Sequence, residues 1–298
     1  MTNEKRLAVA LGISIVILVA EIVGGVLSNS LALLSDAGHV VTDSFAIALS
    51  LIAAKISRRP SDFRATFGYQ RIGLLAAIAN GVSLLGIAVY IFYETYKRFV
   101  TPPEIDAGLM LAVSVGGLLG NGVMALVLSK GHHDLNIKSA WLHILGDLLA
   151  SFGVVVAGVV IYFTGFRLAD PIAGVAVGLL ILLGGVRVVK EALWVFLELV
   201  PAGYDIEEIS RAILDIPEVK GVHDLHLWSI SHGTAAFSAH VWIHDRKLSE
   251  VDRIRAQIER KLDQLGIHHT VLQLECDQCE NNDLYCQVKA DAGHHHDA

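Results

Sequence analysis

Residues 31–55 read LALLSDAGHVVTDSFAIALSLIAAK, an apolar stretch interrupted by an imidazole and two carboxylates. A helix needs about 20 mostly apolar residues to cross the hydrocarbon core of a bilayer, and this stretch is longer than that. Ionisable groups inside such a helix cost free energy and are functional by default. The stretch therefore predicts a membrane-spanning helix in which His39 and Asp43 have a chemical role.

Five more apolar runs of similar length lie before residue 200. Because lipid offers no hydrogen bonds, segments this long must satisfy their own backbone groups, and we expect helices. The run that begins at Leu7 is too long for a signal-peptide core and no clear cleavage site follows it, so we expect it to be retained. The six predicted spans, within a membrane domain of residues 1–200, are 7–28, 31–55, 72–96, 107–129, 136–163 and 171–194.

The distribution of lysine and arginine predicts the direction of the spans. With the N-terminus inside, the cytoplasmic loops and span ends hold 11 of these residues and the outer loops hold three. Because positive residues favour the cytoplasmic side, we expect both termini in the cytoplasm and the chain in the inner (plasma) membrane. The inner residues are Lys5, Arg6, Lys55, Arg58, Arg59, Arg64, Arg71, Lys130, Lys138, Arg187 and Lys190, and the outer ones are Lys97, Arg98 and Arg167.

The chain changes character after Pro201. From there to the end it holds 17 acidic and 9 basic residues, whereas the first 200 residues are nearly neutral. An acidic surface suits the handling of cations, and it argues against nucleic-acid binding, which needs a basic surface. We expect a soluble domain over residues 201–275 and a tail with cysteine and histidine over residues 276–298.

Periodicity predicts the fold of this soluble domain. Two segments carry apolar residues at helical spacing, two others alternate apolar and polar residues, and a short apolar run closes the domain. The order α-β-β-α-β indicates a small open α+β sheet with both helices on one face. The expected helices cover 206–216 and 251–265, and the expected strands cover 219–230, 235–243 and 270–275.

Two histidines lie well inside spans, and each is followed by an aspartate four residues later. The pairs are His39 with Asp43 in the second span and His143 with Asp147 in the fifth. Residues four apart share one helix face, so two such faces turned toward each other offer two imidazole nitrogens and two carboxylate oxygens. This tetrahedral ligand set suits Zn²⁺. At about 1.5 Å per residue, the four residues lie about 12–20 Å from their helix starts, near the middle of the bilayer.

The composition of this four-residue set limits the ion that it binds. It has no thiolate, which disfavours Cu(I), and its imidazoles favour Zn²⁺ over Mg²⁺ or Mn²⁺. The ligand set does not exclude Cd²⁺, Co²⁺ or Ni²⁺ as the bound ion. The alternative interpretation is that these polar residues pair across helices only for packing. Two copies of the same pattern on separate spans make that interpretation the weaker one.

Two further carboxylates inside spans have two interpretations each. Asp36 lies on a similar face to His39, where it either guides ions at the outer side or caps the start of the helix. Glu21 is expected to be buried and paired, with Asn80 or Asn121 as its partner. For Glu21 we favour a structural role over a role in coupling.

Three stretches of the chain carry a family pattern: GGVLSNSLALLSDAGHVVTDSFAIALS at 24–50, LNIKSAWLHILGDLLASFGVVVAGVVI at 135–161 and GVHDLHLWSI at 221–230. They resemble the cation diffusion facilitator family, and within it the bacterial zinc/cobalt/cadmium efflux branch. The resemblance covers nearly the whole chain. It implies a homodimeric metal/proton antiporter in the lipid bilayer, with a metallochaperone-like cytoplasmic domain that senses metal.

Two details refine this resemblance. A sister branch of the family has aspartate at the position of His39, so the imidazole resembles the zinc-preferring members. Zinc transporters of the family often carry a long histidine-rich loop between the fourth and fifth spans. Here that loop has only His132, His133 and Asp134, so a role in metal delivery is in doubt for it.

The resemblance also implies metal sites outside the membrane. Four residues match positions at which some family members bind metal: His223, His240, His268 and Glu275. Cys276 and Cys279 form a C-x-x-C, a spacing typical of metal binding or redox chemistry. The alternative is that these histidines are ordinary surface residues on strands and that the tail is disordered.

Together these features predict a secondary transporter and not an enzyme. Zn²⁺ and protons compete for the same atoms, so we expect zinc export by alternating access, with His39 and His143 as proton carriers. The resemblance further implies that metal bound between the cytoplasmic domains shifts the population toward the transport-competent arrangement. Two alternatives are a membrane zinc hydrolase, which needs an open ligand position and a base, and a metal receptor without transport.

Overall fold

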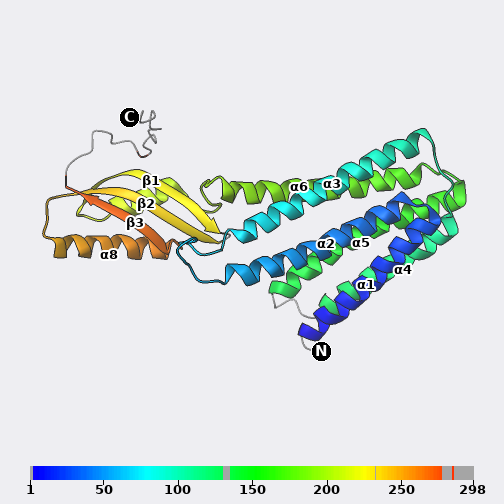
Figure 1. Ribbon diagram of the computed structural model, residues 1–298, viewed down its shortest axis with the longest axis horizontal. Coiled ribbons are helices and arrows are strands. Elements are labelled where there is room, and N and C mark those ends of the chain that lie inside the picture. Colours follow the sequence, from blue (N-terminus) through cyan, green and yellow to red (C-terminus); the bar gives the residue numbers. More distant parts are fainter. Residues whose placement is uncertain (1–2, 130–134, 232, 277–283, 285–298) are drawn as a thin grey trace, which may run out of the picture. The chain divides into compact units, whose positions relative to one another are not determined.

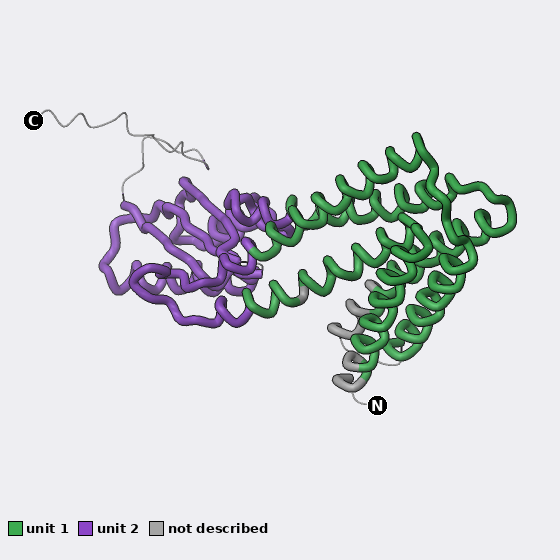
Figure 2. Tube along the Cα trace, turned by 45° about the vertical axis from the view of Figure 1, so that its right-hand side comes forward, with its two compact units in different colours: residues 1–53, 76–190 green, residues 54–75, 191–298 purple. Residues whose placement is uncertain are grey.

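A computed structural model describes residues 3–129, 135–231, 233–276 and 284 of the chain. The chain forms two compact units. Unit 1 holds residues 1–53 and 76–190, and unit 2 holds residues 54–75 together with 191–298 (Figure 2). Unit 2 therefore contains the soluble domain and also the segment that joins two of the long helices.

Six long helices form unit 1, and three of them, α2, α3 and α6, continue into unit 2 (Figure 1). Each is long and apolar enough to cross a membrane. Large apolar side chains such as Val16 and Leu126 are mostly exposed, as expected for surface that faces lipid. The predicted membrane fold is thus confirmed. The helices are α1 (Asn3–Ser28), α2 (Leu31–Ser57), α3 (Ile72–Val100), α4 (Ala107–Ser129), α5 (Leu135–Thr164) and α6 (Ala169–Phe196).

Glycines allow pairs of these helices to approach closely. A Cβ added to Gly120 of α4 would lie only 2.6 Å from Cδ1 of Ile17 in α1. A Cβ added to Gly81 of α3 would lie 2.5 Å from Cγ2 of Val189 and 3.3 Å from the backbone oxygen of Gly185, both in α6. Close packing at small residues is a main source of helix association in lipid, because the hydrophobic effect contributes little where the lipid tails are themselves apolar.

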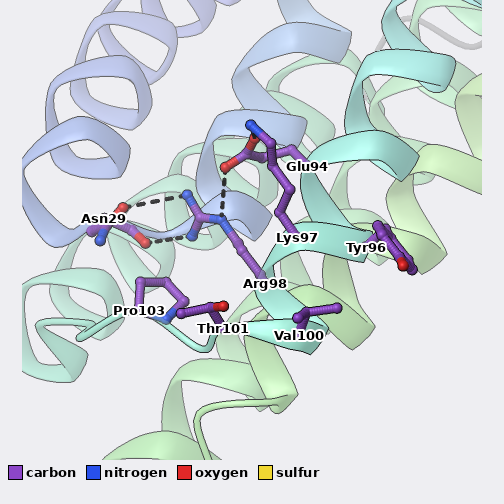
Figure 3. A pocket seen from close by; sticks show the side chains of 8 residues that line it. All are labelled: Asn29, Glu94, Tyr96, Lys97, Arg98, Val100, Thr101 and Pro103. Carbon is purple, nitrogen blue, oxygen red and sulfur yellow. Dashed lines mark hydrogen bonds and ion pairs between the residues drawn. The ribbon is translucent and has the colours of Figure 1, made fainter.

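A buried polar cluster fixes the start of α2. The carboxylate of Asp170, in the first turn of α6, accepts hydrogen bonds from the backbone nitrogens of Leu31 (2.9 Å) and Ala32 (3.1 Å). Arg98, near the end of α3, lies 3.4 Å from the same carboxylate and donates to the backbone oxygen of Asn29 at 2.6 Å. Figure 3 shows the Arg98 guanidinium reaching Asn29 in this way. Three helices are therefore joined at one end of unit 1.

The soluble domain has the α-β-β-α-β order expected from its periodicity. β1 pairs antiparallel with β2, and β2 pairs parallel with β3. Both helices contribute to the same core, in which Phe237, Ile258 and Leu262 are completely enclosed. The elements are α7 (Ile206–Leu214), β1 (Val219–Ser231), β2 (Thr234–Ile243), α8 (Leu248–Gln264) and β3 (His269–Glu275).

Candidate metal centres

Helices α2 and α5 bring three of the four predicted membrane ligands together. The Nε2 atom of His39 lies 3.7 Å from Oδ2 of Asp43, one turn later on α2, and 3.6 Å from Oδ1 of Asp147 on α5. One ligand atom from each residue lies within 4.8 Å of the others. Zinc–ligand distances of about 2 Å put neighbouring ligand atoms about 3–4 Å apart, so the spacing fits a single ion.

These three side chains are largely shielded from solvent. His39, Asp43 and Asp147 expose 26%, 27% and 13% of their side-chain surface, respectively. The fourth predicted ligand, His143, belongs to α5 four residues before Asp147, which places it on the same helix face. Its side chain lies outside the described residues, so its part in the ligand set stays a prediction.

Asp36 lies inside α2 and not at its start. The helix begins at Leu31, and its first backbone N–H groups are bound by Asp170, which excludes Asp36 as the helix cap. The Oδ2 atom of Asp36 instead accepts a hydrogen bond from the hydroxyl of Ser151 on α5 at 3.0 Å, and Asp36 is only 3% exposed. The carboxylate therefore belongs to the polar interior of unit 1.

Glu21 is buried, but its surroundings differ from those expected. The amide of Asn121 donates to Ser151 at 3.0 Å, and no described hydrogen bond joins Glu21 to Asn121 or Asn80. The Oε1 atom of Glu21 faces Gly117 of α4, where an added Cβ would lie 2.9 Å away, and its Oε2 atom has no hydrogen-bond partner among the described residues. Ser151 was not singled out from the sequence. The signal that could have found it is its spacing, since Ser151 follows Asp147 by four residues and therefore shares its helix face.

Three strands bring a second group of potential ligands together in the soluble domain. The β1–β2 register pairs His223 with His240, and their ring centroids lie 5.2 Å apart. Glu275, the last residue of β3, places Oε2 3.3 Å from Nε2 of His223 and Oε1 2.9 Å from Nδ1 of His240. Two imidazoles and a carboxylate are a ligand set that suits Zn²⁺, and the three ligand atoms lie within 4.8 Å of one another.

The other ligands predicted for this domain lie apart from the cluster or outside the described residues. His268 pairs with Asp263 and exposes 73% of its side chain, so the structure does not bring it to the group of three. Cys276 is exposed and directly follows Glu275. Cys279 lies outside the described residues.

Asp224 is a neighbour of the cluster that sequence reasoning passed over. Its Oδ2 lies 3.6 Å from Nε2 of His240, and its Oδ1 lies 3.1 Å from Nε2 of His226. The backbone of Asp224 has a φ of 49°, a left-handed conformation that few residues other than glycine adopt. Strained positions of this kind often occur at binding sites.

Two family models match nearly all of the chain. The cation efflux transmembrane domain matches residues 7–197, and the cytoplasmic domain of cation efflux proteins matches residues 201–276. The chain belongs to the cation efflux family. This result confirms the resemblance to the cation diffusion facilitators that was found in the sequence.

Several curated members of the cation efflux family are similar over almost their full length. A cadmium, cobalt and zinc/H(+)-K(+) antiporter of Bacillus velezensis is 38% identical, over 99% of this chain and 96% of the relative. The metal cation efflux system protein CzcD of Cupriavidus metallidurans is 40% identical, over 94% and 89%. The zinc transporter ZitB of Escherichia coli is 38% identical, over 99% and 95%. A solved metal-bound C-terminal domain of the CzcD transporter from Cupriavidus metallidurans is 32% identical, covers 24% of this chain and 99% of that domain, and gives a TM-score of 0.22.

Membership of the cation efflux family makes the chain a multi-pass membrane transporter and not an enzyme. This confirms the prediction from the sequence, and it sets aside the zinc hydrolase. One curated relative is named as a cadmium, cobalt and zinc antiporter, another as a metal cation efflux protein and a third as a zinc transporter.

In this cation efflux protein, the loop between α2 and α3 contacts the soluble domain within unit 2. The hydroxyl of Ser231, at the end of β1, donates to Oε1 of Gln70 at 2.9 Å. Arg71 pairs with Glu198 at 2.7 Å. The ring of Phe67 meets the ring of His269 edge-on, with centroids 5.6 Å apart. The loop that follows α2 therefore forms a hydrogen bond with β1, a ring contact with β3 and an ion pair with the chain after α6.

The same loop is organised around one carboxylate. Asp62 accepts hydrogen bonds from the backbone nitrogens of Arg64 (2.8 Å) and Ala65 (2.9 Å) and from the hydroxyl of Tyr69 (2.8 Å). These bonds favour the ionised form. The bond from Arg64 has the largest effect, and together they lower the pKa of Asp62 from its ordinary value. The hydrogen bond to Asp62 in turn raises the pKa of the Tyr69 phenol.

Proposed function

We propose that this cation efflux protein exports Zn²⁺ from the cytoplasm in exchange for protons, through a site made of His39, Asp43, His143 and Asp147. The observation that carries the proposal is the approach of His39 Nε2 to carboxylates of two different helices, Asp43 on α2 and Asp147 on α5. Residues that only stabilised packing would not need to gather potential ligand atoms within 4.8 Å.

The ligand chemistry supports zinc as the preferred substrate. Imidazole nitrogen and carboxylate oxygen are the donors typical of Zn²⁺ sites without thiolate. The same donors accept Cd²⁺ and Co²⁺, and one curated relative is named for cadmium, cobalt and zinc. We therefore propose Zn²⁺ as the main substrate, with Cd²⁺ and Co²⁺ as competing substrates.

Proton exchange follows from the ligands themselves. An imidazole must be neutral and a carboxylate ionised to bind metal, so each proton that arrives weakens zinc binding. Zinc enters from the cytoplasm as protons leave, and protons from outside later displace it. Because the ligands lie on two helices, a shift of α2 against α5 changes the geometry of the site and its access.

The soluble domain is proposed as the metal sensor of the transporter. His223, His240 and Glu275 would hold a regulatory Zn²⁺, and Cys276 with Cys279 would add ligands beside it. The family model that matches residues 201–276 carries a name that denotes a dimer domain, which supports a homodimer. We further propose that both termini lie in the cytoplasm, that the chain lies in the inner membrane, and that the domains divide at residues 200 and 275.

Zinc flux into proteoliposomes with an imposed pH gradient tests this function. The native chain should transport zinc at a rate that depends on the gradient, and Asp147→Ala should lower the rate at least about tenfold, because it removes a charged ligand. Asp245→Ala, which removes an exposed carboxylate of the soluble domain, is the matched control and should transport normally. Flux that is equal in Asp147→Ala, or indifferent to pH, would falsify the proposal, and zinc binding without any flux would indicate a receptor.

A further inference from the structure

A cavity lies beside the loop that joins α2 to α3, where this loop meets the strand β1. Its volume is about 550 Å³, and it is lined by residues of the loop, of the start of α3 and of β1. All of these residues belong to unit 2 (Figure 2). They include none of the ligands proposed for either metal centre. The cavity is therefore a separate feature of the protein, and the chemistry of its walls indicates what it can bind.

The walls of this cavity come from a membrane span on one side and from the soluble domain on the other. Ile72 and Leu75 line it, and both belong to the first turn of the span that α3 forms. Leu75 is 57% exposed, as expected for a side chain that faces lipid. Trp228 and Ile230 of β1 form part of the opposite wall. Because lipid headgroups lie directly outside the hydrocarbon layer that a span crosses, the cavity lies at the depth of the headgroups.

The cavity contains a positive charge that the protein does not balance. Arg71 and Glu198 both line it, but they pair with each other at 2.7 Å. Arg64 also lines it and is exposed, and no residue that the structure describes forms an ion pair or a hydrogen bond with its guanidinium. The backbone nitrogen of Arg64 donates to Asp62 at 2.8 Å, so its position in the loop is fixed. A guanidinium held in this way suits a phosphate group, which it can bind through two parallel hydrogen bonds.

The chain around Arg64 adds to this positive charge. Residues 55–71 hold five basic residues and one acidic residue, which leaves a net charge of +4. The acidic residue is Asp62, and its carboxylate is turned toward the loop itself, where it accepts hydrogen bonds from two backbone nitrogens and from the hydroxyl of Tyr69. Clusters of lysine and arginine directly beside a membrane span attract anionic lipids. The charge of the segment therefore favours an anionic partner in the membrane.

An exposed aromatic ring in the same loop favours a lipid over a soluble anion. Phe63 directly precedes Arg64 and is fully exposed. A phenyl ring in water is unfavourable because its apolar surface is hydrated, whereas an apolar ring beside basic residues is typical of surfaces that lie in the headgroup layer. The preference of positive residues for the cytoplasmic side explains arginines in this loop. It explains neither the exposed ring nor a cavity that places Arg64 beside Leu75 of a span.

We propose that this cavity binds the headgroup of an anionic phospholipid, with the lipid phosphate held by the guanidinium of Arg64 and the acyl chains lying along Leu75 of α3. Trp228 forms part of the wall next to the headgroup. A lipid bound here contacts the loop between two spans and the strand β1 at the same time, so it connects the soluble domain to the membrane surface. The inference does not depend on the proposed zinc transport, because it uses none of the zinc ligands.

Native mass spectrometry of the full-length protein in detergent, titrated with phosphatidylglycerol, measures the affinity for the first lipid bound. The native chain should bind phosphatidylglycerol more tightly than phosphatidylcholine, whose headgroup has no net charge. Arg64→Gln should lower the affinity for phosphatidylglycerol at least about tenfold, because it removes a charged hydrogen-bond donor to the phosphate. Arg253→Gln removes an exposed arginine of α8 that does not line the cavity, and this matched control should bind as the native chain does.

A measurement on the native chain gives a result that does not depend on the folding of a variant. Phenylglyoxal modifies exposed arginine side chains, and peptide mapping follows its reaction at Arg64 and at Arg253 separately. Phosphatidylglycerol should protect Arg64 and leave Arg253 reactive, whereas phosphatidylcholine and inorganic phosphate should protect neither.

Four results would overturn the proposal. They are equal affinities of the native chain for phosphatidylglycerol and phosphatidylcholine, native affinity for phosphatidylglycerol in folded Arg64→Gln, an equal loss of that affinity in Arg253→Gln, and no protection of Arg64 by phosphatidylglycerol. Protection of Arg64 by inorganic phosphate at the same concentration would identify a site for a soluble anion, and it would overturn the assignment to a lipid.

Discussion

The carboxylate of Asp170 caps a helix to which it does not belong: its Oδ2 lies 2.9 Å from the backbone nitrogen of Leu31. An N-terminal residue of α6 thereby binds the N-terminus of α2, where exposed N–H groups and the helix dipole both favour a negative charge. Arg98 supplies the balancing positive charge and is itself 7% exposed. The first turn of α2, the helix that carries His39, is thus fixed by an ion pair between residues of α3 and α6.

Removing Asp170 should strongly destabilise the protein. Asp170→Ala removes one of the two carboxylates that pair with the buried Arg98, leaving Glu94 at 3.6 Å, and it removes the acceptor of the Leu31 and Ala32 backbone N–H groups. We therefore expect a loss of about 2–4 kcal/mol. Thermal unfolding in detergent measures the effect as a lowered midpoint. Asp106→Ala is the matched control, because Asp106 caps α4 at an exposed position, and it should cost only about 1 kcal/mol. Equal midpoints for the two variants would contradict the role of the buried pair.

The close contact of α3 with α6 should depend on Gly81. In Gly81→Ala the new methyl group would lie 2.5 Å from Cγ2 of Val189 and 3.3 Å from the backbone oxygen of Gly185, so the helices must separate. Overpacking of this kind costs about 1–3 kcal/mol. In Gly86→Ala, on the same helix, the methyl group meets nothing within 4 Å. That control should keep the native unfolding midpoint or raise it slightly, since alanine is the better helix former.

The soluble domain should lose its metal when His240 is replaced. In the full-length protein, His240→Ala removes a ligand that lies 2.9 Å from Glu275, and we expect zinc affinity at this site to fall by at least the 10–100-fold typical of losing an outer-sphere partner. His268→Ala changes an exposed histidine of the same domain and should leave the affinity unchanged. Titration of each variant with zinc measures the affinity. An equal loss of zinc affinity in His268→Ala and His240→Ala would refute the assignment of His240 to the metal site.

The loop between α2 and α3 should loosen in acid. Because the pKa of Asp62 is lower in the folded protein than in the unfolded chain, its hydrogen bonds stabilise the loop at pH values above the ordinary aspartate pKa, about 4. That stabilisation is lost as the pH falls below this value through the folded pKa. Hydrogen exchange at the amides of Arg64 and Ala65 measures it. Their protection factors, relative to the intrinsic exchange rate at each pH, should fall with acid in the native chain. In Asp62→Asn the acid dependence should disappear.

The Tyr69 phenol gives an independent readout of the same loop. Its pKa is raised by its hydrogen bond to Asp62, so ultraviolet titration should show one tyrosine that ionises later than an ordinary phenol. In Asp62→Asn this late titration should move back toward the ordinary value, because the neighbouring negative charge is gone. An unchanged titration would mean that the hydroxyl does not bond to Asp62 in solution.

The parts of the fold that could be predicted depend on local sequence patterns. The helices around His39 and Asp147 follow from the length of apolar runs, and the pairing of β1 with β2 follows from alternation on either side of the turn at Gly233. The spacing of His39 and Asp43 also fixes a shared face before any tertiary contact is known. These features need only the geometry of one helix or one hairpin.

The parts that could not be predicted depend on contacts between distant segments. Asp170 caps α2 from 139 positions away, and Ser151 reaches Asp36 across 115. His268 and Glu275 looked equivalent in sequence, but only Glu275 lies on the strand end next to His240. Which of two distant residues reaches a site depends on strand register and on the rotation of each helix about its axis. The periodicity of the sequence does not determine either of these.

Helix α2 runs without interruption from Leu31 to Ser57, and His39 lies in its first half. Between His39 and Ser57 it has neither glycine nor proline, the residues at which helices usually kink. His39 lies 18 residues before Ser57, which is about 27 Å along the axis of this helix. Any rotation of α2 about its own axis would therefore change the direction in which the imidazole of His39 points.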